Sequence, residues 1–390
     1  MQIMEDVMGN SNQGSKKRKS KRAAKKRRNQ IILFSIEFIV LAVLCVVLYI
    51  VIKFYNSNNT PGENDISGDT ASGWDLFPQY EGGEDVPGYK LVALFGVDSR
   101  EGELKQNTRT DTIMIACLNE ETKEYKLLSV YRDTYLNLSN DSYNKCNAAY
   151  AKGGGNQALN MLNMNLDLNI DKFITVGFKG VVETVDSLGG VPIDIKEEEM
   201  QYLNSYQSCI CDDLNRQSEY KPITTPGLQT LTGLQACGYC RIRYTAGSDF
   251  KRTERQRTVL YEMLEQSKKM NITQVNDVVN SSFSNICTNM SMKELLDFAA
   301  DYASYTKAAD DGFPFEQNRG VATIGKTGSC VIPLDLTSNV VQAHEFLFGE
   351  TDYEPSDTVV KCSEKIKEDT TPYLDPEDLA KIPNYAESEN

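Results

Sequence analysis

The pattern of apolar and polar positions divides the chain into one long hydrophobic run near its start and a region of short, alternating runs after it. Residues 31–52 are apolar except for Ser35 and Glu37. As a helix, these 22 residues at about 1.5 Å each reach about 33 Å, enough to cross a hydrocarbon core of about 30 Å. The run therefore predicts a membrane-spanning helix over residues 30–54.

A polar stretch rich in Asn, Gly, Asp, Ser and Pro follows at residues 55–88 and predicts a flexible stalk. After it, short runs of strand character alternate with runs of helical spacing, and two strands flank the polar turn NEETKE as in a hairpin. This alternation predicts an α/β or α+β layered domain with helices packed on a central sheet. The predicted strands cover 90–95, 111–118, 125–130, 173–176 and 191–195, and the predicted helices cover 158–166, 178–188, 250–268 and 291–306.

The two parts of the chain before and after residue 56 carry opposite net charge. The first 56 residues carry eleven Lys or Arg against Glu5, Asp6 and Glu37, whereas the remainder carries 30 basic and 52 acidic residues. Positive charge is retained on the cytoplasmic side, which predicts a single-pass cell-membrane protein with a cytoplasmic N-terminus and an extracytoplasmic domain after Lys53. The acidic outer part argues against a nucleic-acid partner.

Ten cysteines are many for an outward-facing chain, and four of them form two close pairs. Cys209 and Cys211 make one pair, and Cys237 and Cys240 make the other. The 25 residues between the pairs and the oxidising location disfavour a four-thiolate zinc site. Disulfides between the pairs and free thiols both remain open on the sequence.

Arginines concentrate in one place. Ten arginines follow residue 56, and five of them lie within 17 residues. The planar guanidinium fork suits bidentate contact with phosphate, and the start of a helix after Asp249 would add its positive dipole end. On this cluster alone, a surface lattice of salt bridges explains the pattern equally well. The five are Arg241, Arg243, Arg252, Arg255 and Arg257; 241–243 is expected to be strand-like, and Arg252, Arg255 and Gln256 to share one helix face.

A second constellation of arginines and aspartates lies upstream, at or just beyond the ends of strand-like runs. Its segments are 96–100 (GVDSR), 109–112 (RTDT) and 132–134 (RDT). Two carboxylates near arginines suit a hard cation that takes phosphate oxygens as its other ligands, as magnesium does. Each Asp alone reads equally well as a turn residue.

Two mechanisms lack the residues they need. His344 is the sole histidine and lies far from both constellations, so a Ser-His-Asp or Cys-His mechanism has no base. The glycines at 153–155 are not followed by the Lys-Ser or Lys-Thr of a Walker loop. Phosphate chemistry by arginine, carboxylate and metal remains, and it depends on positioning and charge neutralisation.

With these residues in view, the chain resembles the LytR-CpsA-Psr family. The matching segments lie in the family's order and cover about 89–270: LVALFGVDSR, TRTDTIMI, LLSVYRDTYL, KCNAAYAKGG, FKGVVETVDSLGGVPIDI, LTGLQACGYCRIRY and DFKRTERQ. The resemblance implies an α/β/α domain with a central mixed sheet and a hydrophobic polyprenyl-binding pocket. It also implies transfer of teichoic acid, capsule or a related polymer from undecaprenyl pyrophosphate to a peptidoglycan hydroxyl, the muramic acid 6-position being expected, with release of undecaprenyl phosphate.

The family motifs assign roles to individual residues. Asp98 and Asp111 would hold Mg²⁺, with Mn²⁺ as the alternative ion. Asp111, Arg132 and Asp249 would be catalytic, one of the two aspartates assisting deprotonation of the acceptor. The expected pyrophosphate contacts are Arg100, Arg109, Arg132, Arg241, Arg243, Arg252, Arg255 and Gln256.

The predicted organisation has six parts, and two other functions stay open. They are a cytoplasmic basic segment (1–29), the membrane helix (30–54), the stalk (55–88), the catalytic domain (89–270), a C-terminal helical extension (271–363) and a disordered acidic tail (364–390). One alternative function is hydrolysis of a polyprenyl pyrophosphate with water as acceptor. The other is a non-catalytic envelope regulator that binds lipid pyrophosphate.

Overall fold

The computed structural model describes residues 83, 85–99, 104, 108–244, 248–302 and 304–382. The predicted cytoplasmic segment, membrane helix and nearly all of the stalk lie outside these residues. Among the helices that are described, none combines the length and the apolar character needed to cross a membrane. All described residues belong to one compact unit, residues 63–390.

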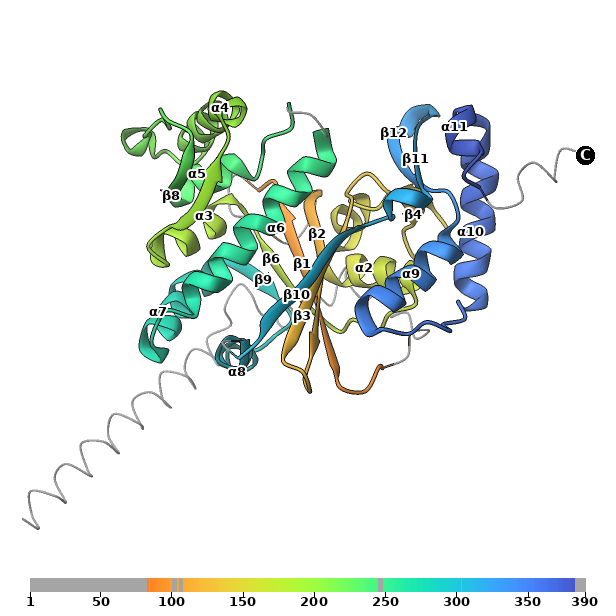
Figure 1. The fold of residues 1–390 in the computed structure, drawn as a ribbon, viewed down its shortest axis with the longest axis horizontal. Helices are drawn as coiled ribbons and strands as arrows, with labels where there is room; N and C mark the ends of the chain where they lie inside the picture. Colours follow the sequence, from red (N-terminus) through yellow and green to blue (C-terminus); the bar gives the residue numbers. More distant parts are fainter. Residues whose placement is uncertain are drawn as a thin grey trace, which may run out of the picture. The chain divides into compact units, whose positions relative to one another are not determined.

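A mixed six-stranded sheet forms the centre of this unit (Figure 1). Its strand order is β10-β3-β2-β1-β6-β9, with parallel pairs β10–β3 and β1–β6 and antiparallel pairs elsewhere. The predicted hairpin is confirmed, since β2 and β3 pair across the polar turn. The strands are β1 Tyr89–Val97, β2 Thr110–Asn119, β3 Glu124–Val130, β6 Lys172–Val176, β9 Ile286–Thr288 and β10 Thr306–Phe313.

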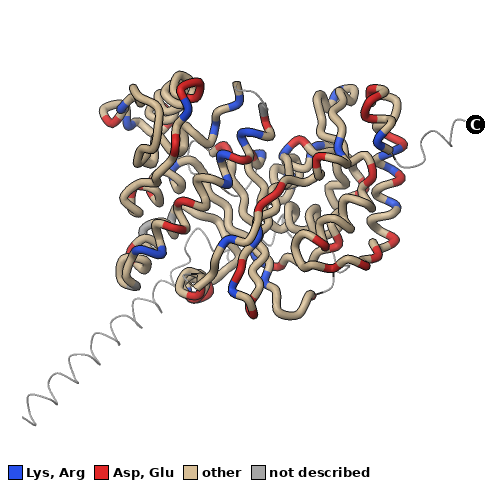
Figure 2. Tube along the Cα trace, in the orientation of Figure 1, with Lys and Arg blue, Asp and Glu red and all other residues tan. Residues whose placement is uncertain are grey.

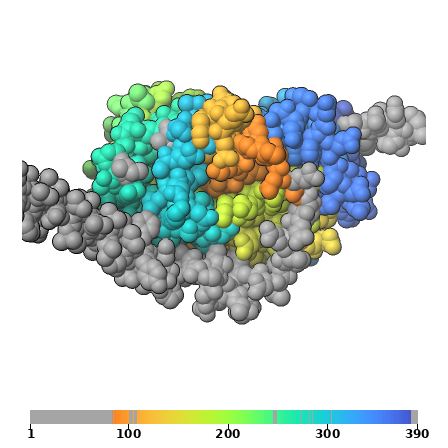
Figure 3. Space-filling model, turned by 90° about the horizontal axis from the view of Figure 1, so that it is seen from below, coloured from red at the N-terminus to blue at the C-terminus, as the bar shows by residue number. Residues whose placement is uncertain are grey.

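Helices cover both faces of the sheet, which confirms the predicted layered α/β architecture. Alternation along β1 shows why: Phe95 faces a core built with α2, α9 and α10, whereas Leu94 faces a core built with α6 and α8. Figure 3, which views the molecule from below, shows the C-terminal residues beside the central strands. The helices are α2 Ala148–Leu166, α9 Leu336–Phe348 and α10 Asp357–Thr370 on the first face, and α6 Ser248–Ser267, α7 Ile272–Ser282 and α8 Met292–Tyr302 toward the second.

A smaller group of elements packs beside α6 around its own apolar cluster. In it, β7 pairs with β8, and α5 packs against α3 and α4. Two further hairpins and a short helix complete the unit. The elements of the smaller group are α3 Phe178–Ser187, β7 Val191–Ile195, α4 Glu197–Asp213, β8 Gly227–Leu231 and α5 Gly233–Tyr239; the others are β4 Tyr135–Asn137, β5 Tyr143–Lys145, β11 Arg319–Ile324, β12 Gly328–Pro333 and α11 Pro376–Leu379.

The prediction of a disordered tail from residue 364 is wrong for residues 364–382. Helix α10 continues to Thr370 and is followed by α11, and Ile366 and Leu374 are buried in the main core. The acidic composition concealed a helical stripe, because Val359, Cys362 and Ile366 recur at intervals of three and four residues on the buried face. Residues 383–390 lie outside the described part.

The segment 271–363 is also more than a helical extension. Strands β9 and β10 come from it and form the two edges of the central sheet, by pairing with β6 and β3. Neither strand could be predicted from its residues, because β9 has three residues and β10, TKAADDGF, is largely polar. The catalytic domain predicted at 89–270 therefore needs this segment to complete its sheet.

The four cysteines of the two predicted pairs, Cys209, Cys211, Cys237 and Cys240, are free thiols in the structure. Cys211 and Cys237, one from each predicted pair, pack in the same apolar cluster between α4 and α5. Burial raises the pKa of the Cys237 thiol to about 12. A zinc site is not formed there, since no three His, Cys, Asp or Glu side chains of the described residues are grouped to hold a metal.

Candidate functional site

The carboxyl ends of β1, β3, β6 and β10 and the start of β2 lie at the same edge of the sheet, because these four strands point one way and β2 runs opposite to β1 and β3. Helix α6 begins at this edge (Figure 1). Figure 2 shows Lys and Arg gathered there beside the start of α6. Ligands of open α/β sheets bind outside the carboxyl ends of the strands, which makes this edge the first place to look for a site.

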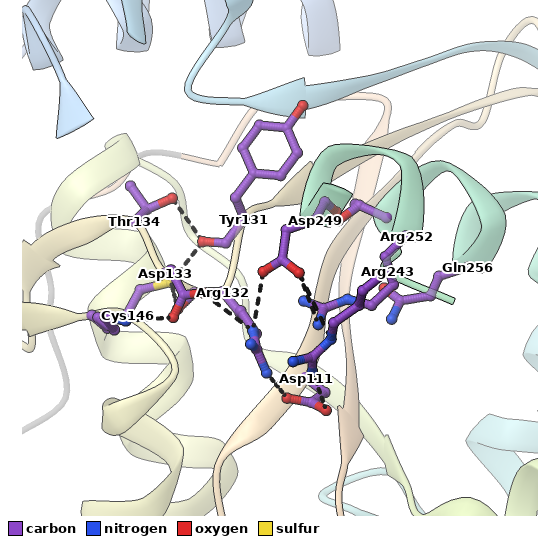
Figure 4. Close-up of polar contacts among 12 residues, drawn as sticks. Asp111, Tyr131, Arg132, Asp133, Thr134, Cys146, Arg243, Asp249, Arg252 and Gln256 are labelled. Atoms are coloured by element: carbon purple, nitrogen blue, oxygen red, sulfur yellow. Dashed lines mark hydrogen bonds and ion pairs between the residues drawn. The ribbon is translucent and has the colours of Figure 1, made fainter. Parts of the chain in front are cut away.

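Five charged side chains meet at this edge and are called here the arginine–aspartate cluster: Asp111, Arg132, Arg243, Asp249 and Arg252 (Figure 4). They come from β2, the segment after β3, the segment after α5 and the first turns of α6. The structure thus brings together residues from the two constellations of the sequence. The two constellations, one with Asp111 and Arg132 and the other with Arg243 and Arg252, are separated by more than a hundred positions along the chain.

Asp111 owes its position to an irregularity in the sheet. Val97 of β1 pairs with Thr110 and Gly96 pairs with Thr112, so Asp111 is an extra residue in β2. Such a bulge bends the strand and redirects a side chain, and bulges are frequent next to active sites. The Asp111 carboxylate contacts Arg132 Nη1 through Oδ1 and lies 3.5 Å from Arg243 Nη2 through Oδ2.

Arg132 stands between the cluster and a second ion pair. Its Nε lies 3.3 Å from Asp133 Oδ2 and 3.6 Å from Asp249 Oδ2, and Asp133 Oδ1 is 3.1 Å from Lys145 Nζ. Although burial alone would lower it, the pKa of Arg132 is raised by the carboxylates of Asp111, Asp133 and Asp249. The guanidinium is therefore firmly charged. Lys145 was not predicted, because a single lysine outside any motif does not mark a site.

Asp249 lies in the first turn of α6 and makes only long ionic contacts. Its Oδ1 is 3.3 Å from Arg252 Nη1 and 3.7 Å from Arg243 Nε. The side chain keeps 35% of its surface exposed, compared with 25% for Asp111. Asp249 is thus the carboxylate of the cluster that an incoming group can reach most easily.

Arg252 carries a buried charge that the protein leaves partly unsatisfied. It is 2% exposed, and neither Nε nor Nη1 makes a hydrogen bond within the described structure. Burial, followed by the nearby charge of Arg132, lowers the pKa of Arg252 to about 10, with Asp249 opposing the change. A buried donor without an acceptor costs about 1–3 kcal/mol, more on a charged group, so this site is suited to an anion supplied from outside.

Other polar atoms around the cluster also lack a hydrogen-bond partner in the described structure. Arg132 Nε, Arg241 Nη1 and Gln256 Oε1 are buried without a hydrogen-bond partner among the described residues. The guanidinium of Arg241 stacks over the ring of Phe178, the first residue of α3, at 4.6 Å from the ring centroid. Stacking fixes the plane of the fork while its N–H groups stay available.

The backbone around Arg241 differs from the prediction. Residues 241–243 follow helix α5 as a turn and not as a strand, and Ile242 between the two arginines is fully buried. Ile242 anchors the turn in the apolar cluster of the smaller group. The prediction of a strand rested on alternation over three residues, which a turn anchored by one buried side chain reproduces.

Arg255 does not join the cluster, although it is buried on α6 together with Arg252 and Gln256, with which it was predicted to share a helix face. Its Nε contacts Glu199 Oε1 at 2.8 Å and its Nη1 donates to the carbonyl of Ile242 at 3.2 Å. Both side chains of the ion pair are buried. The predicted pyrophosphate contact of Arg255 is therefore replaced by a structural one, because α6 turns this residue toward α4. Arg257, likewise, contacts Asp310 of β10 at 2.6 Å.

Three further candidates lie at the border of the site. Asp98 directly follows β1 and is exposed, and its carbonyl accepts a hydrogen bond from Thr108 at 3.3 Å. Arg109 directly precedes β2 and is exposed. Arg100 lies outside the described residues, so its predicted role stays a prediction.

Two of the candidate residues have side chains of the kind that bind a divalent metal. Asp98 and Asp111 supply hard carboxylate oxygens at the adjoining ends of β1 and β2, which fits magnesium. Since no group of three such ligands exists in the described part of the chain, phosphate oxygens and water would have to supply the others. This is how magnesium is commonly bound at phosphate sites.

A set of aromatic contacts beside the cluster comes from the C-terminal part of the chain and was not predicted from the sequence. Arg319 of β11 stacks over Phe250 at 4.0 Å and over Tyr131 at 5.1 Å, and its Nη1 donates to the Tyr131 hydroxyl at 3.0 Å. Tyr131 and Phe250 directly adjoin Arg132 and Asp249 in the chain. No local motif marks Arg319, because its partners are distant in sequence.

Fold and cluster together define a layered α/β protein with a cluster of arginines and aspartates at one edge of its sheet. The family model of the LytR_cpsA_psr family matches residues 49–320, and the chain belongs to this family. The resemblance noted in the sequence is thereby confirmed.

Two curated relatives and one solved structure give the family context. The chain is 27% identical over 308 residues to the polyisoprenyl-teichoic acid–peptidoglycan teichoic acid transferase TagT of Bacillus subtilis (strain 168), covering 77% of this chain and 90% of TagT. It is 29% identical over 212 residues to TagV of the same organism, covering 53% of this chain and 51% of TagV. A structure of TagT bound to LI-WTA superposes with a TM-score of 0.51 at 21% identity, covering 74% and 94% of the two chains, and so shares the fold.

Proposed function

We propose that this protein is a phosphotransferase that moves a glycopolymer from undecaprenyl pyrophosphate to a peptidoglycan hydroxyl and releases undecaprenyl phosphate. One observation carries the proposal. Among the described residues, buried guanidinium N–H groups of Arg132, Arg241 and Arg252 lack hydrogen-bond acceptors beside two reachable carboxylates. The names of TagT and TagV, whose donors are polyisoprenyl-teichoic acids and whose acceptor is peptidoglycan, support the choice of substrates.

The diphosphate would accept hydrogen bonds from guanidinium N–H groups that make none within the described structure. Arg252 and Arg132 would each direct N–H groups at its oxygens, and Arg241 would add its stacked fork. Preorganised donors of this kind stabilise the charge that develops on phosphate oxygens during transfer. Because the donors are fixed by burial and stacking, little reorganisation is needed when the substrate binds.

In the transfer step, the acceptor hydroxyl oxygen would bond to the phosphorus that carries the sugar, and the bond from that phosphorus to the polyprenyl phosphate oxygen would break. The hydroxyl proton would pass to a carboxylate, for which we choose Asp249. Its long contacts and 35% exposure favour it over Asp111, whose carboxylate is held tightly by Arg132. Asp111 would orient Arg132 and Arg243.

A magnesium ion would be held by Asp98 and Asp111, with manganese as the alternative ion. When bound, the ion would neutralise negative charge on the diphosphate oxygens. Asp111 also contacts Arg132 and Arg243, so the same carboxylate would help to hold the ion and would keep the two guanidiniums in place.

The location of the reaction belongs to the same proposal. The apolar run at 31–52 and the basic residues before it support a single-pass anchor that holds the domain outside the cell membrane. The polyprenyl chain would lie in a hydrophobic pocket next to the cluster. The shared fold of TagT, solved with LI-WTA bound, supports a site for such a donor in this architecture.

The test is transfer by the full chain in detergent micelles. A lipid-pyrophosphate-linked oligosaccharide and a muropeptide glycan are supplied with magnesium, and the products are weighed by mass spectrometry. We expect a phosphodiester-linked conjugate and polyprenyl phosphate from the wild type. At least a hundredfold less is expected from Arg132→Ala, which removes a preorganised donor, and from Asp111→Ala, which removes the carboxylate that orients it.

Lys293→Ala provides the matched control, because it also breaks an ion pair, the exposed one with Asp297 on α8. It should transfer like the wild type. Unchanged turnover in both cluster variants would reject the site. Release of the oligosaccharide phosphate without a conjugate would instead identify a hydrolase, and tight lipid binding without any product would identify a regulator.

A further inference from the structure

An exposed tyrosine, Tyr244, lies beside the arginine–aspartate cluster and against Tyr202, a partly buried residue that packs on the apolar cluster of the smaller group. Tyr244 is 71% exposed, more than Tyr220 at 38% or Tyr373 at 50%. Its ring lies 5.9 Å from the ring of Tyr202 on α4, at an interplanar angle of 37°. This exposure leaves the aromatic ring of Tyr244 open to a ligand.

The chain connects both tyrosines to the proposed diphosphate site. Tyr244 directly follows Arg243, whose Nη2 is 3.5 Å from Asp111. Tyr202 precedes Tyr206 by one turn of α4, and the guanidinium of Arg241 lies 5.4 Å from the centroid of the Tyr206 ring. Tyr244 is thus the chain neighbour of one arginine of the site, and Tyr202 lies one helical turn from a residue that contacts another.

We propose that Tyr202 and Tyr244 form a stacking platform for the first sugar of the lipid-pyrophosphate donor. The inference rests on the proposed function and adds a specificity-determining site to it. The first sugar is bonded to the diphosphate, so it must lie next to the groups that hold the diphosphate. The C–H face of a pyranose ring carries slight positive charge and suits the negative face of an aromatic ring, and the tyrosine hydroxyls can hydrogen-bond to sugar hydroxyls.

The two tyrosines are uncharged, which distinguishes the platform from the anion site beside it. A second phosphate would be better served by Arg or Lys, whereas a neutral ring is what an aromatic face selects. Core packing accounts for Tyr202 but not for Tyr244, which leaves most of its surface in solvent. The acceptor glycan and the membrane interface are the other partners that an exposed tyrosine could serve, and the experiment separates them.

The experiment compares two probes on the full chain in detergent micelles. One is a polyprenyl pyrophosphate carrying one N-acetylhexosamine, and the other is the same polyprenyl pyrophosphate without sugar. Tyr244→Ala should weaken binding of the sugar-bearing probe about fivefold to tenfold, the order expected for one aromatic stacking contact, and leave the sugar-free probe unchanged. Tyr244→Phe should bind both probes nearly as the wild type does. Tyr373→Ala, which removes another exposed tyrosine, is the matched control.

Each other result overturns the platform. An equal loss for both probes would assign Tyr244 to the diphosphate site, and no loss would leave it without a role in donor binding. A rise in KM for the muropeptide acceptor alone would assign it to the acceptor. Weaker association with sugar-free phosphatidylglycerol vesicles would assign it to the membrane. If the wild type binds neither probe, the proposed function fails and the platform fails with it, whereas equal wild-type binding of both probes rejects the platform alone.

Discussion

The buried charge of Arg252 makes a prediction that separates stability from function. Arg252→Met keeps an unbranched side chain of similar length but removes a cation buried beside two others. Since burial and neighbouring arginines lower the pKa of Arg252 from 12.5 to about 10, and a tenfold change in a proton equilibrium is about 1.4 kcal/mol, the charge costs on the order of 3 kcal/mol. Loss of the contact with Asp249 offsets part of this. We expect the free energy of unfolding without ligand to rise by about 1–3 kcal/mol.

The same substitution should remove the response to ligand. A ligand at one hundred times its dissociation constant stabilises the native state by about 2.7 kcal/mol. Farnesyl pyrophosphate with magnesium should therefore stabilise the wild type in urea unfolding followed by far-ultraviolet circular dichroism. It should stabilise Arg252→Met far less, because charge-assisted hydrogen bonds worth about 1.5–3 kcal/mol are lost.

Arg255→Met is the matched control on the same helix. Arg255 is also buried, but it contacts Glu199 at 2.8 Å, so its removal leaves a buried carboxylate without its partner. We expect a loss of about 3–5 kcal/mol in the free energy of unfolding, with the stabilisation by farnesyl pyrophosphate retained. If Arg252→Met is destabilised to the same extent and still responds to farnesyl pyrophosphate, Arg252 is structural and the reasoning is refuted.

Two further predictions concern the C-terminal segment. Arg319→Ala should lower kcat about tenfold with little change in the donor KM, because Arg319 supports Tyr131 and Phe250 beside the cluster. Arg319→Lys should partly restore kcat. An unchanged kcat in Arg319→Ala would reject this positioning role. Although burial opposes the change, hydrogen bonds from hydroxyls of α9 and the charge of Lys367 lower the pKa of Asp335 below its usual 3.8. The contribution of the Asp335 carboxylate to stability should be complete above pH 3.8 and be lost as the pH falls through the folded pKa. Asp335→Asn should therefore be less stable than the wild type at pH 7 and approach it in acid. A constant difference in unfolding midpoint across this range would contradict the assignment.

Much of the fold could be predicted because its buried strands and helices have strong apolar patterns. The hairpin of β2 and β3 and the helices α3, α6 and α8 were expected close to where they lie. The edge strand β10 was not, since polar residues at an edge carry no alternation. The tail was misjudged because overall acidity concealed the stripe of Val359, Cys362 and Ile366.

The candidate site shows a similar division. Arginines and aspartates could be selected by type and by their positions at strand ends, and the structure brings Asp111, Arg132 and Arg252 together. The exclusion of Arg255 could not be predicted, since it depends on Glu199, which is 56 positions away on α4. Helix spacing gives the face of α6 on which a residue lies, but only tertiary packing gives the partner it meets.

The most direct test of the central claim is a crystal structure of the chain with a polyprenyl pyrophosphate and magnesium. The account predicts diphosphate oxygens within hydrogen-bond distance of Arg132 Nε, Arg241 Nη1 and Arg252 Nε, at the carboxyl edge of the sheet. A diphosphate bound elsewhere, with these three nitrogens still lacking acceptors, would contradict it.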